Sequence, residues 1–97
     1  MCDVLIVDGE MMMIRARGHA TGSQDCCSGV STILYSLAGY LRNDPKAQID
    51  ELTLQEADAG IVFRGGKNAR GAFLMAKIGL LQLEKAYGEY MRVNVME

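Results

Sequence analysis

Residues 4–17, VLIVDGEMMMIRAR, decide the fold, because two apolar segments flank a turn signal. The run Val4 to Val7 is apolar and β-branched, as is typical of a strand. Asp8-Gly9 is a strong hairpin signal, and Met11 to Arg17 reads as the returning strand. The alternate positions of that second strand are apolar: Met12, Ile14 and Ala16. This alternation predicts a β-hairpin with one face turned toward a core.

The next apolar pattern has the period of a helix. We expect this helix to run from near Asp25 to about Arg42, where apolar residues recur every three or four positions. Either Ser23 or Asp25 can cap its first turn by accepting hydrogen bonds from free backbone N–H groups. Residues 43–45, Asn-Asp-Pro, end it, because the residue before a proline avoids helical geometry.

The remainder of the chain predicts two more strands, a second helix and a last strand. The strands are expected at Glu51 to Ala57 and Gly60 to Arg64, with a turn over residues 57–60. The second helix is expected from about Asn68 to Tyr87, and the last strand from Arg92 to Val95. The order ββαββαβ predicts an α+β fold, in which a mostly antiparallel sheet is covered by two helices.

Composition limits the class of protein. With 97 residues, the chain fits a single domain over residues 1–97, and 49% hydrophobic residues suffice for one core. The net charge of −2, with scattered Lys and Arg, argues against a dedicated nucleic-acid surface. No signal peptide or membrane-spanning run is visible, so no membrane partner is expected. The three cysteines include one adjacent pair, which favours free thiols in a reducing cytoplasm.

The residues with the clearest chemical potential are Cys26, Cys27 and the single histidine, His19. A cysteine attacks as its thiolate, and a helix N-terminus favours that negative charge. A histidine one short loop away can form the ion pair and protonate a leaving group. The alternative is that both cysteines are small apolar core residues and His19 is an ordinary loop residue. A metal site is less favoured, because adjacent cysteines lack structural-zinc spacing.

Several short motifs resemble those of the ribosomal-processing cysteine protease family. Members of that family have a β-hairpin ending in Gly-His-Ala, followed by an Asp shortly before Cys-x-x-Val-Ser at a helix start. The corresponding motifs here are Gly18-His19-Ala20, Asp25 and Cys27-Ser28-Gly29-Val30-Ser31. The resemblance extends over nearly the whole chain, including residues 87–95 at its end. It implies that Cys27 is the catalytic nucleophile and His19 the catalytic histidine, with Cys26 one position before the nucleophile.

The resemblance also implies a function. Family members remove a short N-terminal extension from a large-subunit ribosomal protein, cutting beside an aromatic-rich motif. We therefore expect a cytoplasmic cysteine endopeptidase that needs no cofactor or metal. Its expected substrate is a ribosomal protein precursor or, for a phage-encoded relative, a viral structural protein. A homodimer is expected through the second helix and the sheet face, because that helix is apolar on more than one side.

Three further residues are possible supporting groups: Asp25, Ser28 and Ser31. Backbone N–H groups around Cys27 and Ser28 are expected to stabilise an oxyanion. Ser31 lies one helical turn after Cys27, although a mid-helix serine often bonds its own backbone instead. The loop between His19 and Cys27 is shorter than in the family, and Asp25 aligns with the family's Asp only through a gap. The alternative function is a non-catalytic dimeric protein of the same fold that binds a peptide or a ribosomal segment.

Overall fold

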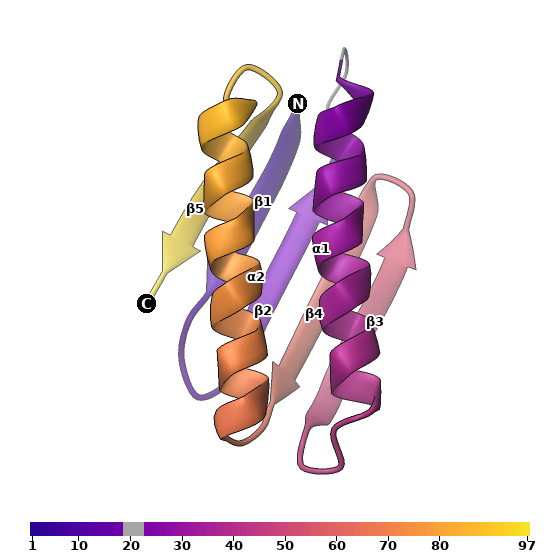
Figure 1. Ribbon diagram of the computed structural model, residues 1–97, viewed down its shortest axis with the longest axis vertical. Helices are drawn as coiled ribbons and strands as arrows, with labels where there is room; N and C mark the ends of the chain where they lie inside the picture. Colours follow the sequence, from indigo (N-terminus) through magenta and orange to yellow (C-terminus); the bar gives the residue numbers. More distant parts are fainter. Residues whose placement is uncertain (19–22) are drawn as a thin grey trace.

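Figure 1 shows a computed structural model of the chain, which describes residues 1–18 and 23–97. In chain order, its elements are β1 (Cys2–Val7), β2 (Met12–Arg17), α1 (Gln24–Arg42), β3 (Gln48–Gln55), β4 (Asp58–Arg64), α2 (Lys67–Ala86) and β5 (Met91–Met96). The ββαββαβ order and the α+β class predicted from the sequence are therefore confirmed.

The strands of the described residues form one sheet in the order β3-β4-β2-β1-β5. Neighbouring strands are antiparallel except β1 and β5, which are parallel. The predicted hairpin β1–β2 occupies the middle of the sheet, where Ile14 lies opposite Ile6 on one side and Ile61 on the other. Both helices cover the same face of this sheet (Figure 1).

The core lies between that face and the two helices. Alternate residues of β1 and β2 point into it, as the sequence pattern predicts, including Met12, Ile14 and Ala16. Phe63 of β4 and Phe73 of α2 are fully buried and meet edge to face, with ring centroids 5.9 Å apart. Aromatic pairs in this geometry are favourable beyond the area that they bury. Neither α1 nor α2, the helices of the described residues, is both long and apolar enough to span a bilayer.

The start of α1 is fixed by a side-chain cap. Ser23 has extended backbone angles, and its hydroxyl accepts a hydrogen bond of 3.2 Å from the Cys26 N–H. Of the two predicted caps, Ser23 is therefore the one used. Further along α1, Gly29 packs against Leu83 of α2 so closely that an added Cβ would lie 3.0 Å from the leucine side chain. This contact brings the two helices together next to the start of α1.

Two details of the β3–β4 hairpin differ from the prediction. Strand β3 begins at Gln48 rather than at the predicted Glu51. The prediction missed its first residues because a register irregularity between Ile49 and Glu51 breaks the alternation that marks a strand. The turn lies at residues 56–57, where Ala57 has a φ of 62°, so the predicted turn over residues 57–60 is wrong. Gly60 is instead a buried strand residue opposite Arg15, and an added Cβ would lie 3.6 Å from the Arg15 guanidinium, an ordinary contact distance.

Candidate active site

A cavity of about 860 Å³ opens at the end of the sheet where β2 finishes and α1 begins. Its walls come from the N-terminal half of α1, from the β3–β4 hairpin and from the neighbouring ends of β1 and β2. A concave site of this size can enclose a substantial part of a peptide or a small molecule.

The α1 wall presents polar side chains at helical spacing. Gln24, Cys27, Ser28 and Ser31 all line the cavity. Residues three or four positions apart share one face of a helix, so the spacing explains why these side chains face the same hollow. Leu34 and Tyr35 continue the wall one turn further along, which makes it apolar away from the helix start. The candidate nucleophile thus lies where a polar stretch of α1 gives way to an apolar one.

The three cysteines have different surroundings. Cys26 is completely buried in the core, Cys2 is 5% exposed, and Cys27 is half-buried in the cavity wall. Burial raises the pKa of the Cys26 thiol, and the charge of its neighbour Cys27 raises it further. Burial is also the main cause that raises the pKa of Cys2. Cys2 and Cys26 are therefore held as neutral thiols, which are poor nucleophiles.

The wall opposite α1 is acidic. The charged side chains that line the cavity, among the described residues, are Glu56 and Asp58 of the β3–β4 hairpin. Asp58 pairs with Arg17 at 3.8 Å, but both side chains are more than half exposed, so the pair contributes little. This wall favours a ligand that is neutral or positively charged on that side.

A single glycine joins β2 to this wall. The N–H of Gly18 donates a 2.9 Å hydrogen bond to the carbonyl of Ala57 in the hairpin turn. Its φ of 88° is rare for other residues, and an added Cβ would lie 2.5 Å from the Met1 carbonyl oxygen. Gly18 is thus needed for the backbone path that closes this side of the cavity.

The structure brings three of the predicted site residues to the cavity: Cys27, Ser28 and Ser31. Asp25 is exposed in the first turn of α1 and does not line the cavity. His19 lies outside the described residues, so its pairing with Cys27 stays a prediction from the sequence.

The backbone around Cys27 differs from the expectation. The Cys27 N–H donates to the carbonyl of Ser23 at 3.3 Å, and the Cys26 N–H donates to the Ser23 hydroxyl. Both groups are engaged by the cap residue, because it satisfies the N–H groups of the first helical turn. The Cys27 N–H is therefore not a ready donor for an oxyanion.

The lining residues that were not predicted as site residues include Gln24, Glu56 and Asp58. A helical-spacing argument from Cys27 could have found Gln24, which precedes it by three positions. The two carboxylates carry no such local signal, since only the pairing of β3 with β4 and their packing against α1 place them there.

Across residues 1–18 and 23–97, no three His, Cys, Asp or Glu side chains are grouped so that they could hold a metal ion.

Solved structures of other proteins share this fold, although no family model and no curated protein matches the sequence. Prp, an essential ribosomal processing protease from S. aureus, superposes with a TM-score of 0.78 in a complex with a covalently linked product peptide. The two chains are 19% identical, and the match covers 98% of this chain and 99% of Prp. A second Prp structure, in complex with a substrate peptide, has a TM-score of 0.75 at 16% identity, with 98% and 99% coverage.

SMU.848 from Streptococcus mutans has the same architecture, with a TM-score of 0.76 at 18% identity. That match covers 99% of this chain and 94% of SMU.848. These likenesses extend from one end of each chain to the other, so the match includes every element that builds the cavity. The chain therefore has the fold of the ribosomal processing protease Prp, as the resemblance in its sequence predicts.

Proposed function

We propose that this chain is a cysteine endopeptidase that processes a ribosomal protein precursor, with Cys27 as its nucleophile. One observation carries the proposal: Cys27 lines a cavity of about 860 Å³ in a fold shared throughout its length with Prp. The Prp structures hold a substrate peptide or a covalently linked product peptide, which supports a peptide as the ligand here.

The position of Cys27 suits nucleophilic attack. It occupies the fourth residue of α1, close to the positive end of the helix dipole, which favours a negative charge on sulfur. His19 takes the proton of the thiol, and the sulfur then forms a bond to the scissile carbonyl carbon. His19 returns the proton to the leaving amine, and water hydrolyses the resulting thioester.

The cavity wall suits a peptide with apolar side chains. Leu34 and Tyr35 of α1 face the same hollow as Leu54 of β3. Apolar walls with a few polar groups are typical of sites that bind such ligands. Together with the sequence resemblance, this supports a precursor with an aromatic-rich cleavage motif. We expect cleavage to occur in the cytoplasm, where ribosomal proteins are made. A viral structural protein is the substrate to test next.

A second copy of the chain is the proposed partner of α2. Leu74, Met75 and Ile78 are 37%, 77% and 59% exposed, and they are neighbours on the α2 surface. Apolar side chains gathered in this way are typical of an interface. Sedimentation equilibrium at micromolar concentration is expected to give about twice the chain mass of 10.6 kDa. A monomer at that concentration would contradict the dimer.

The function is tested by incubating the wild-type chain and Cys27→Ala with large-subunit ribosomal protein precursors. Mass spectrometry of the products should show one N-terminal fragment released by the wild type and none released by Cys27→Ala. Cys26→Ser is the matched control, because Cys26 is buried beside the nucleophile, and it should cleave at a similar rate. If the wild type binds a precursor without cutting it, the non-catalytic peptide-binding function becomes the better account.

A further inference from the structure

Attack by Cys27 would place a negative charge on the oxygen of the scissile carbonyl. Enzymes usually stabilise this charge with fixed hydrogen-bond donors. The nearby backbone supplies few of them, because the N–H groups of Cys26, Cys27 and Gly18 already donate to protein oxygens. The missing donor therefore has to come from a side chain on the cavity wall or from a part of the chain not described here.

Gln24 has the right position on α1. It precedes Cys27 by three residues, and both side chains line the cavity. Side chains of a helix tilt toward its N-terminus, so the Cys27 sulfur lies over the turn that contains Gln24. Ser31 also lines the cavity, but it lies one turn beyond Cys27, on the side from which the sulfur points away.

The chemistry of Gln24 also fits. A carboxamide carries two N–H donors on a long side chain, whereas the serine hydroxyls are shorter. Gln24 is exposed, and its side chain makes no hydrogen bond to the rest of the described chain. Its donors are thus available to an atom that enters the cavity.

We propose that the Gln24 carboxamide is the oxyanion donor of this site, an inference that rests on the proposed peptidase function. As the sulfur–carbon bond forms, the π electron pair of the carbonyl moves onto its oxygen. The Gln24 N–H group donates to that oxygen. When the carbonyl reforms, the carbon–nitrogen bond breaks and the amine leaves with the proton from His19.

The test compares Gln24→Ala, Gln24→Glu and Ser31→Ala on a precursor peptide that the wild type cleaves. Loss of one oxyanion donor typically lowers kcat by about a hundred- to a thousandfold, so both Gln24 variants should show that loss with little change in KM. Ser31→Ala should lose less than about tenfold. Gln24→Glu should remain folded, because a carboxylate in the first helical turn is favourable. A loss of cleavage activity in this variant is therefore not caused by unfolding.

Alkylation of Cys27 by iodoacetamide supplies a second readout, because this substitution at a carbon–iodine bond forms no oxyanion. Gln24→Ala should alkylate at the wild-type rate while its peptide cleavage falls. Equal cleavage by Gln24→Ala and the wild type, or an equal loss of alkylation and cleavage, would overturn the role of Gln24 alone. A wild-type chain that alkylates at Cys27 but cleaves no precursor would overturn the proposed function as well.

Discussion

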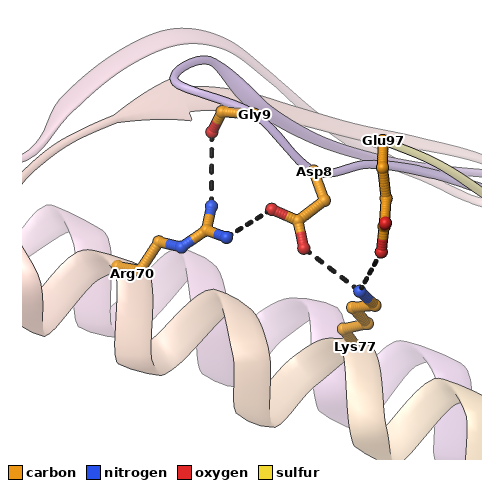
Figure 2. Close-up of polar contacts among 5 residues, drawn as sticks. All are labelled: Asp8, Gly9, Arg70, Lys77 and Glu97. Carbon is orange, nitrogen blue, oxygen red and sulfur yellow. Dashed lines mark hydrogen bonds and ion pairs between the residues drawn. The ribbon is translucent and has the colours of Figure 1, made fainter.

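The two ends of the sheet are built differently. At the end where β1 turns into β2, Asp8 is only 11% exposed and binds both Arg70 and Lys77 of α2, the latter at 3.1 Å (Figure 2). Arg70 also donates to the Gly9 carbonyl at 3.3 Å, and Lys77 reaches Glu97 at 3.5 Å. These contacts hold the turn and the chain end against α2.

The other end of the sheet, the open end, holds the cavity. There, the ion pair between Arg17 and Asp58 is exposed, and polar side chains of α1 line an open volume. Polar groups that line a cavity can bind a ligand, whereas charged groups joined in a network stabilise the fold. Charges therefore stabilise one end of the molecule, and the other is the end at which we propose binding and catalysis.

The largest expected effect is the dependence of cleavage on Cys27, at the open end, and on His19. Cys27→Ala should abolish turnover, and His19→Ala should lower it by about a hundred- to ten-thousandfold, because it removes general acid–base help. The double variant should be little worse than Cys27→Ala, since residues of one catalytic unit are not additive. Steady-state cleavage of a cognate precursor checks this. If His19→Ala cleaves the precursor at the wild-type rate, His19 and Cys27 do not form a catalytic pair.

Thiol reactivity should distinguish Cys27 in the cavity wall from the cysteines buried in the core. Cys27 should react with iodoacetamide at neutral pH well before Cys2 or Cys26, because burial keeps the latter two thiols neutral and inaccessible. Peptide mapping after limited treatment gives the order. Faster labelling of Cys26 would contradict the assignment of the nucleophile.

Gly18→Ala should destabilise the open end through the backbone. A left-handed φ costs most residues about 1–3 kcal/mol, and the new Cβ would also meet the Met1 carbonyl. Gly71→Ala is the matched control, because Gly71 lies within α2 with open space around it, and it should stabilise the chain by about 0.5–1 kcal/mol. Urea unfolding measures both. Equal stability of the two variants would show that the Gly18 backbone is not constrained.

At the end of the sheet where β1 turns into β2, Asp8→Asn should lower the unfolding temperature more than Asp58→Asn does at the open end. Among the described residues, Asp58 has one distant, exposed partner, whereas Asp8 has two close ones. Thermal unfolding followed by circular dichroism compares these variants. A larger loss in Asp58→Asn would reverse the comparison between the two ends.

Acid should destabilise the fold by protonating the Asp8 carboxylate. The pKa of Asp8 lies below its ordinary value, mainly because Lys77 donates a hydrogen bond to its carboxylate and, as the next largest cause, because Arg70 does so too. The stability that this carboxylate contributes is thus present above its ordinary pKa and is lost as the pH falls through the lowered one. Below about pH 4, wild-type stability should therefore decline more steeply than that of Asp8→Asn. Parallel pH profiles of the two proteins would contradict this role of Asp8.

Local patterns in the sequence predicted most of the fold. Alternation in residues 11–17 and the apolar stripe of α1 gave the correct elements, because each follows from the period of a single strand or helix. The predicted β3–β4 hairpin was shifted, because the irregularity after Ile49 breaks the period and Gly60 lies within a strand rather than in a turn. Cys27 was found from its motif, but Glu56 and Asp58 were not, since their place in the cavity depends on contacts between distant segments.

The central claim is that Cys27 attacks a peptide bond, and the covalent intermediate tests it most directly. A precursor peptide is mixed with the wild-type chain, quenched in acid within the first turnover and analysed by mass spectrometry. We expect a mass increase equal to the acyl fragment of the peptide, mapped to Cys27 and absent from Cys27→Ala. Release of both fragments with no adduct in any quench, or an adduct on Cys2 or Cys26, would contradict it.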